Sequence, residues 1–254
     1  MSNRKDHYYN KSKQEGYRSR AAYKLKQIDD RYSILSAGDV VVDLGAAPGG
    51  WLQVERERVG DGGRVVGVDL QRIDPIDGVE TVKGDMTDAE TRAEIRELAG
   101  DRVDVVVSDM APNMTGEYGL DHARSVHLAR TAFETALAVL DGGGAFVVKV
   151  FDGPDFAAFR RDVEREFDKV WTTSPDASRE SSSELFVVAK GQLTAPVRVG
   201  ETHEVEITDV GSEGDGIAKV EGFTLFVPDA EVGETPTVRV TDVKARFGFA
   251  EKAE

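Results

Sequence analysis

The chain has no cysteine, which excludes disulfide bonds and every metal site built on thiolate ligands. Histidine is scarce: of the four present, no two have a zinc-site spacing such as HExxH. The sequence therefore predicts no bound metal. No apolar run approaches the roughly 18 residues of a membrane-spanning helix, and the amino end lacks the apolar stretch of a signal peptide. These absences predict a cytoplasmic protein with no membrane partner.

Positive charge is also in short supply. The 254 residues hold 47 acids against 32 bases, a formal net charge of −15, and only 12 of the bases are lysine. Such an acidic chain with few lysines is typical of proteins that stay soluble at very high salt, and it also fits an ordinary acidic protein. A halophilic source is therefore a hypothesis at this point.

The bases that are present gather at the amino end. Residues 1–31 contain nine Lys or Arg and four acids, a net charge of +5, which leaves −20 for the remainder. An acidic total argues against a nucleic-acid partner, but a basic, tyrosine-bearing head on an acidic body favours one.

From residue 39 onward, short β-branched runs alternate with stretches of helical character. Apolar runs followed by polar or glycine-rich turns are typical of strands buried on both faces of a parallel sheet. The expected strands are 40–44, 65–70, 79–82, 103–108, 145–150, 168–173 and 184–190. The expected helices are 50–58, 88–99, 121–140 and 155–167, the third beginning behind Gly119. This order predicts an α/β fold with a doubly wound, Rossmann-like sheet.

The pattern changes near residue 195. Short alternating segments at 204–210, 224–228 and 237–243 are separated by glycines, and helical periodicity is absent. This spacing predicts a small OB-like β-barrel. We therefore expect two domains, 1–194 and 195–254.

A glycine-rich segment, DLGAAPGGW at 43–51, follows the first expected strand and opens a helix. Asp69, Asp85 and Asp109 lie at the ends of the next three strands in chain order. Because carboxyl ends of parallel strands share one edge, these acids should line one crevice. Asp69 suits ribose hydroxyls and Asp85 an adenine amino group. Together they predict a positively charged nucleoside, S-adenosyl-L-methionine, although each acid alone is more often a helix cap.

Three further charged residues stand out. Lys149 lies in an otherwise apolar strand, where a lysine must reach a site, form an ion pair or extend to water. Glu184 opens the last strand of the first domain, where it is either a site residue or an exposed residue at the edge of the sheet. Lys24 lies in the basic head, where it is either a site residue or a lysine on a solvated helix face.

The order and spacing of five motifs resemble the FtsJ/RrmJ (RlmE) family of RNA 2′-O-methyltransferases over residues 8–191. The motifs are RSRAAYKL, DLGAAPGGW, SDMAPN, VVKVF and SSELFVVA. The resemblance implies a catalytic tetrad of Lys24, Asp109, Lys149 and Glu184. It also implies the cofactor contacts Gly49, Trp51, Asp69, Asp85 and Asp109. The implied partner is large-subunit (23S) ribosomal RNA, with a uridine of the A loop as target and a monomeric enzyme.

Several alternatives stay open at this stage. Lys149 is either the base that removes the hydroxyl proton or the cation that stabilises the developing alkoxide, and Trp51 either lies beside the cofactor or fills the core. Transfer RNA is an alternative substrate. A non-catalytic ribosome-assembly factor and a small-molecule methyltransferase are alternatives of other classes, which the intact tetrad and the basic head disfavour.

The tail, from Gly211 to Ala230, is similar to a TRAM domain over residues 195–254. We expect an RNA-holding module in which Phe223 and Phe226 offer stacking faces, unless they belong to the barrel core. The candidate basic contacts are Arg239, Lys244 and Arg246.

Overall fold

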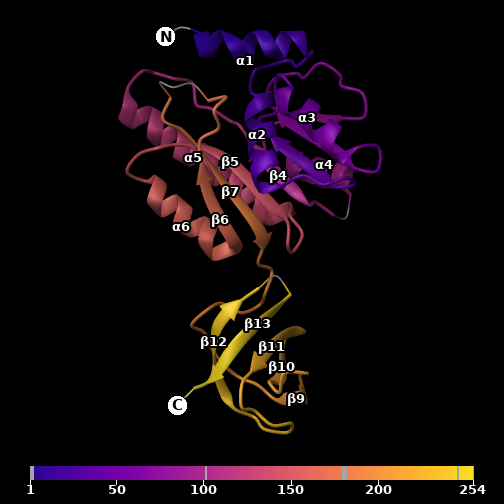
Figure 1. Ribbon diagram of the computed structural model, residues 1–254, viewed down its shortest axis with the longest axis vertical. Helices are drawn as coiled ribbons and strands as arrows, with labels where there is room; N and C mark the ends of the chain where they lie inside the picture. Colours follow the sequence, from indigo (N-terminus) through magenta and orange to yellow (C-terminus); the bar gives the residue numbers. More distant parts are fainter. Residues whose placement is uncertain (1–2, 101, 179–181, 245, 254) are drawn as a thin grey trace.

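The computed structural model describes residues 3–100, 102–178, 182–244 and 246–253, in two modules stacked along the long axis of the molecule (Figure 1). The expected domains 1–194 and 195–254 both include positions outside these ranges: 1–2, 101, 179–181, 245 and 254. In the part of the chain that is described, no helix is long and apolar enough to cross a membrane.

The first module is built on a seven-stranded sheet of order β3-β2-β1-β4-β5-β7-β6. Its strands are β1 (Val40–Leu44), β2 (Arg64–Asp69), β3 (Glu80–Lys83), β4 (Val105–Ser108), β5 (Ala145–Phe151), β6 (Phe167–Thr173) and β7 (Glu184–Gln192). The first five are parallel, and β7 runs antiparallel to both of its neighbours. The predicted doubly wound, Rossmann-like sheet is confirmed, with its strand order reversing between β1 and β4.

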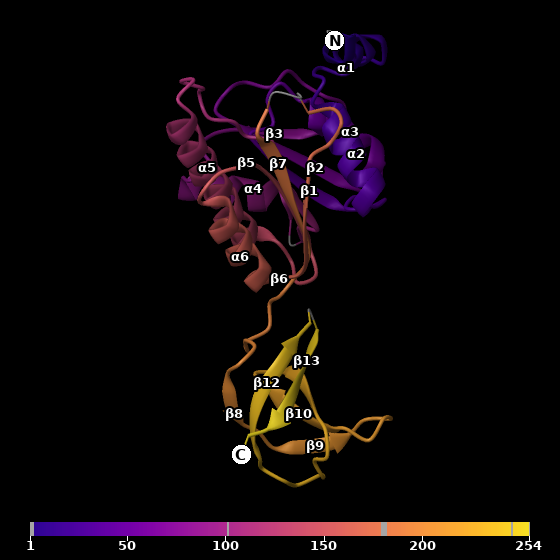
Figure 2. The same ribbon diagram turned by 60° about the vertical axis from the view of Figure 1, so that its left-hand side comes forward.

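Helices cover both faces of this sheet (Figure 2). One face packs against α2 (Ala22–Tyr32) and α3 (Gly50–Val59), and the other against α4 (Ala89–Ala99), α5 (Tyr118–Val139) and α6 (Phe156–Glu166). Alternate residues of the central strands point to opposite faces, so Val41 joins the first core and Val42 the second. The central strands are therefore apolar on both faces along most of their length.

Two details of the helices differ from the sequence-based expectation. The basic head forms α1 (Asn3–Gln14) and α2, which charge alone did not predict. The third helix begins at Tyr118 and includes Gly119, so the expected start behind Gly119 is wrong. The carboxylate of Asp121 accepts hydrogen bonds from Thr115 and Gly116, which fixes the turn ahead of the helix and lets its first turn hold a glycine.

The second module is a curled six-stranded sheet of order β8-β12-β13-β11-β10-β9. Its strands are β8 (Thr202–Glu204), β9 (Ile207–Val210), β10 (Gly216–Val220), β11 (Phe223–Val227), β12 (Thr237–Val243) and β13 (Phe247–Lys252). The predicted strand-rich tail is confirmed, but β10 and β13 were not among the expected segments. Each contains glycine, which lowered its strand signal.

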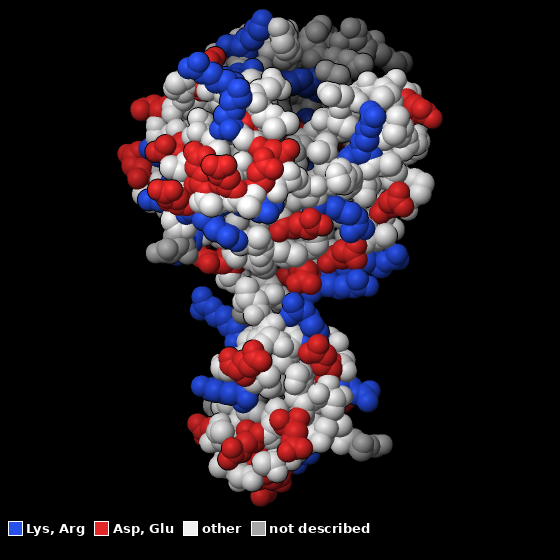
Figure 3. Space-filling view, turned by 180° about the vertical axis from the view of Figure 1, so that it is seen from behind, with Lys and Arg blue, Asp and Glu red and all other residues white. Residues whose placement is uncertain are grey.

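The second module attaches at the amino-terminal edge of the parallel strands. In β7, Glu184 pairs with the end of β5 and Lys190 with its beginning, so this strand runs from the carboxyl edge to the amino edge. Its eight residue steps span about 26 Å. Beyond it, Lys244 forms an ion pair with Asp168 (3.0 Å). The narrow waist between the modules is visible in Figure 3, where acidic and basic side chains are interspersed on both.

Two carboxyl groups lie inside the first module without a hydrogen-bond partner among the described residues: Asp43 on β1 and Glu55 on α3. Burial raises the pKa of Glu55 well above its usual range, and the nearby Asp43 raises it further. The folded protein therefore holds a proton at this pair at pH values where the unfolded chain has lost it.

This pair predicts that Glu55→Met stabilises the protein. Removing an unsatisfied buried carboxyl should raise the free energy of unfolding by about 1–3 kcal/mol. The pKa of Glu55 is higher in the folded protein than in the unfolded chain, where it is about 4.3. The stability of the wild-type protein therefore falls as pH rises from the unfolded pKa toward the folded one. The stabilisation by Glu55→Met should for this reason be larger at pH 8 than at pH 5. Denaturant unfolding at both pH values measures it. The exposed Glu94→Met on α4 serves as control, and an equal effect of the two substitutions would contradict the assignment.

Candidate active site

The glycine-rich turn that follows β1 is shaped by backbone conformations that favour glycine. Gly45 and Gly49 have φ of +80° and +102°, in the left-handed region. A Cβ on Gly45 would overlap the side chain of Met110, and one on Gly49 would lie 2.9 Å from Ile76 Cδ1 and 3.0 Å from Arg18 Nη1. These glycines therefore let two neighbouring segments approach the turn closely.

A cavity of about 690 Å³ opens beside this turn at the carboxyl edge of the sheet. Asp69, Asp85 and Asp109 all line it, as the order of the strands predicted. Asp69 accepts hydrogen bonds from the backbone N–H groups of Ala47 and Gln71, at 3.0 and 2.7 Å. One oxygen of Asp85 accepts the backbone N–H and the hydroxyl of Thr87, and these bonds lower its pKa. The side chains of Asp69 and Asp85 are thus held in place, and Asp85 stays an ionised carboxylate.

A smaller cavity of about 190 Å³ shares the lining residues Gly45, Ala47 and Asp109 with the first. The two cavities therefore adjoin, and together they are called the cleft. Trp51 lines it, and only 3% of this side chain is exposed. Its indole N–H donates to the carbonyl oxygen of Ala21 at 2.8 Å, and its ring lies against Phe186. Trp51 therefore fills the core and borders the cleft at once.

Asp43 also faces this smaller cavity and was not among the predicted contacts. Both of its carboxyl oxygens lack a partner among the described residues, and burial, followed by Asp109 and Asp69, raises its pKa. An unpartnered buried acid beside two others fits a ligand that carries positive charge. The signal in the sequence was an acid interrupting the apolar run of the first strand.

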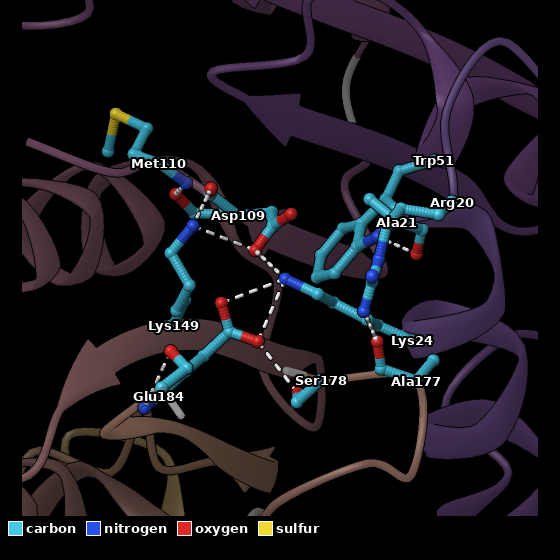
Figure 4. Close-up of polar contacts among 12 residues, drawn as sticks. Arg20, Ala21, Lys24, Trp51, Asp109, Met110, Lys149, Ala177, Ser178 and Glu184 are labelled. Atoms are coloured by element: carbon cyan, nitrogen blue, oxygen red, sulfur yellow. Dashed lines mark hydrogen bonds and ion pairs between the residues drawn. The ribbon is translucent and has the colours of Figure 1, made fainter. Parts of the chain in front are cut away.

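Four charged side chains from separate parts of the chain converge around Asp109, which also lines the cleft (Figure 4). Lys24 Nζ lies 2.8 Å from Glu184 Oε1 and 3.5 Å from Asp109 Oδ1. Lys149 Nζ lies 2.9 Å from the same Oδ1 and also donates to the backbone carbonyl of Asp109. The exposed fractions of Lys24, Lys149 and Glu184 are 6–8%. The predicted residues thus form one nearly dry cluster of two cations and two anions.

The helix that carries Lys24 is pinned to the glycine-rich turn. Arg18 donates to the backbone carbonyls of Pro48, Asp74 and Pro75, and Arg18 N–H donates to the side chain of Gln53 on α3. With the bond from Trp51 to Ala21, these contacts set the start of α2 against the cleft. The basic head is therefore part of the site.

Glu184 is oriented by a residue that the sequence did not single out. The Ser178 hydroxyl donates to Glu184 Oε1 at 2.7 Å, and Lys24 Nζ lies 2.8 Å from each of the two carboxylate oxygens. The adjacent Ala177 is buried, its carbonyl accepts from Arg20 and its N–H donates to Gln27 of α2. Helix α2 thus holds the loop that places Ser178 on the carboxylate.

The tail presents an aromatic surface that differs from the expected one. The strand register sets Phe226 beside Phe249 on one face, with Phe247 next along β13, and their rings lie 5.6–5.9 Å apart. Phe247 and Phe249 are each 37% exposed. Phe223 packs against the core instead, so only one of the two predicted stacking faces points outward. Lys244, a predicted contact, is engaged in ion pairs with Asp168 and Asp242.

Comparison with known proteins agrees with this geometry. The model of the FtsJ-like methyltransferase family matches residues 17–192, and that of the TRAM domain matches 196–253. The chain is 68% identical to "Ribosomal RNA large subunit methyltransferase E" of Natronomonas pharaonis, over 99% of both chains. It is 64% identical to the protein of the same name from Halobacterium salinarum R1, over 100% of this chain and 99% of that one. Both are halophilic archaea, which is consistent with the acidic composition.

Among solved structures, one described as a ribosomal RNA methyltransferase of Plasmodium falciparum is similar, with a TM-score of 0.64 and 28% identity over 69% of this chain and 98% of that one. The chain belongs to the FtsJ-like methyltransferase family and carries a carboxyl-terminal TRAM domain.

Proposed function

We propose that this protein transfers the methyl group of S-adenosyl-L-methionine to the ribose 2′-hydroxyl of a uridine in large-subunit (23S) ribosomal RNA, with the A loop as the target. The observation that carries this proposal is the convergence of Lys24, Asp109, Lys149 and Glu184 beside an acid-lined cleft. The names of the relatives support ribosomal RNA as the substrate. The choice of the 2′-oxygen, the uridine and the A loop rests on the motif resemblance.

The acidic lining of the cleft supports a cofactor that carries positive charge. We assign Asp69 to the ribose hydroxyls, Asp85 to the adenine amino group, and Gly49, Trp51 and Asp109 to the remaining contacts. To these we add Asp43, whose orphaned carboxyl suits the ammonium group at the amino-acid end of the cofactor. S-adenosyl-L-methionine supplies a methyl group on a positively charged sulfur, and acids near such a charge favour its binding.

Within the tetrad, we assign Lys149 the role of a cation that orients the ribose oxygen and stabilises negative charge developing on it. Its ammonium donates to one carbonyl and faces one carboxylate, and an ammonium has three donors and no acceptor. Asp109 Oδ1 faces both lysines at ion-pair distance without a well-aligned hydrogen bond, which leaves it able to accept a hydrogen bond from an incoming hydroxyl. We assign this carboxylate the hydroxyl proton as the ribose oxygen gains the methyl group and the sulfur loses it, which leaves the sulfur as a neutral thioether. Lys24 and Glu184 hold this arrangement in place.

The tail is proposed as a second RNA contact, starting at residue 195. Phe226, Phe247 and Phe249 form an outward aromatic surface of the kind on which unpaired bases stack. Arg239 and Arg246 remain candidate phosphate contacts. We further propose that the enzyme acts as a monomer in the cytoplasm.

The first prediction of the proposed function concerns Lys149. Lys149→Ala should lower the rate of methyl transfer by at least ~100-fold while cofactor affinity stays unchanged, because the lost cation acts on the developing charge. Methyl-labelled cofactor is incubated at high salt with unmodified large subunits and, separately, with transfer RNA. Nuclease digestion then locates the label on the ribose or the base.

Each outcome of this assay is informative. Label on a ribose 2′-oxygen of ribosomal RNA, lost in the variant, supports the proposal. Label confined to transfer RNA would identify transfer RNA as the substrate and leave the site assignments unchanged. Absence of label despite cofactor binding would indicate a non-catalytic assembly factor. In Lys149→Arg, which keeps the charge but is never a base at neutral pH, residual activity well above that of Lys149→Ala supports the electrostatic role.

A second prediction tests the positioning of Glu184. Ser178→Ala should lower kcat roughly tenfold with little change in KM, because the carboxylate loses one of its two fixed partners. Ser178→Thr should restore most of kcat by keeping the hydroxyl. Ser174→Ala removes only a 3.4 Å contact to the Glu184 backbone and should be near wild type. Equal losses in the Ala and Thr variants of Ser178 would contradict this role.

A third prediction concerns the tail. The double substitution Phe226→Ala with Phe249→Ala should weaken binding of large-subunit RNA by roughly tenfold, since each stacked base contributes about 1–3 kcal/mol, while cofactor binding is unaffected. Val232→Ala, at another exposed apolar residue of the tail, is the matched control. Fluorescence anisotropy with labelled RNA measures both, and unchanged affinity in the double variant would exclude the aromatic surface as a contact.

A further inference from the structure

Three exposed apolar side chains lie close together in the sequence of the first module, at Met114, Tyr118 and Leu120. Met114 precedes α5 on the segment that follows Asp109, and Tyr118 and Leu120 belong to the first turn of α5. Clusters of this kind on a polar surface mark places where a partner binds. Neither the described lining of the cofactor cleft nor the tetrad includes them.

Tyr118 is the most ordered member of this cluster, although 61% of it is exposed. Its hydroxyl donates to the backbone carbonyl of Asp152 at 2.8 Å. Its ring lies parallel to that of the buried His122, with 14° between the planes and 6.5 Å between the centroids. The ring is therefore held at one face and at its tip, which leaves the other face toward solvent.

The anchor of Tyr118 belongs to the strand that carries Lys149. Asp152 follows β5 directly, and His122 Nδ1 lies 3.1 Å from the carbonyl oxygen of Phe151. Three residue steps separate Lys149 from Asp152, a distance of about 10 Å along extended backbone. Tyr118 thus stands at the rim of the site, at a fixed separation from the lysine.

The segment leading to Tyr118 is also firmly built. Asp121 accepts two hydrogen bonds from Thr115 and one from Gly116, and these bonds lower its pKa, so it stays a carboxylate and keeps the turn closed. The exposed Arg124, on the next turn of α5, lies near Asn113 and adds positive charge. A fixed, exposed aromatic ring with a cation on the next helical turn is the kind of surface on which a nucleotide base stacks.

We propose that the open face of Tyr118 stacks against the base of an unpaired nucleotide that flanks the methylated one. Bases in loops expose flat apolar faces that aromatic side chains bind, and every such base carries a phosphate. The position at the rim favours a flanking nucleotide over the target itself. This inference rests on the proposed function, since it takes RNA as the substrate.

The test uses the full chain and a target stem-loop RNA at high salt. Tyr118→Ala should raise KM for the RNA, and its Kd measured by anisotropy, roughly tenfold, with kcat at saturating RNA and cofactor affinity within about threefold of wild type. Tyr118→Phe keeps the ring and should stay near wild type. An abasic residue placed in turn at each flanking position should weaken wild-type binding most at one position, and that loss should vanish in Tyr118→Ala.

Two results would overturn the inference. One is an unchanged Kd and KM in Tyr118→Ala, and the other is an abasic effect that is equally large in wild type and variant at every position. A defect seen only with assembled subunits and not with naked RNA would assign the rim to a ribosomal protein and would also overturn it. Failure of the proposed reaction is distinguishable, because the binding measurements do not depend on methyl transfer.

Discussion

The ion-pair cluster of Lys24, Asp109, Lys149 and Glu184 is the interaction on which the rest of the site depends. Each residue comes from a different segment: the amino-terminal helix α2, the end of β4, strand β5 and the start of β7. A buried ammonium or carboxylate is costly unless a partner offsets its charge, so none of the four can leave without destabilising the others. The cluster therefore joins the basic head, the cofactor edge and the antiparallel strand into one structure.

The buried acids beneath this cluster show the opposite situation. Asp43 and Glu55 have no hydrogen-bond partner among the described residues, and burial raises the pKa of both. The nearby acids Asp109 and Asp69 raise the pKa of Asp43 further, and Asp43 raises that of Glu55. Asp43 borders the cleft, whereas Glu55 lies behind it on α3. We interpret the cost at Asp43 as one that a positively charged ligand offsets when it binds, which couples occupancy of the cleft to the stability of the module.

Much of the fold could be predicted because it rests on strong local patterns. The continuous valine-rich runs could only be buried strands, and their order brought Asp69, Asp85 and Asp109 to one edge. The motif resemblance supplied Lys24, Lys149 and Glu184, which the structure brings together. Neither the helices of the head nor strands β10 and β13 could be predicted, because charge and glycine conceal their propensity.

The remaining features depend on register and on contacts between distant segments. Ser178 reaches Glu184 only because α2 holds Ala177 from the other side of the site. Phe247 and Phe249 join Phe226 only through a parallel pairing of β11 with β13. Tyr118 is an unremarkable residue in the sequence until its hydroxyl is seen on Asp152. Spacing along one chain contains none of this information.

The attachment of the TRAM module at the far end of β7 has a consequence for the choice of substrate. Glu184 lies at one end of a nine-residue strand and the TRAM module lies beyond the other end. Any one ligand that touches both the charged cluster and the tail must therefore extend along the whole length of β7. The length of this strand thus sets a minimum size for a substrate that both modules hold at once.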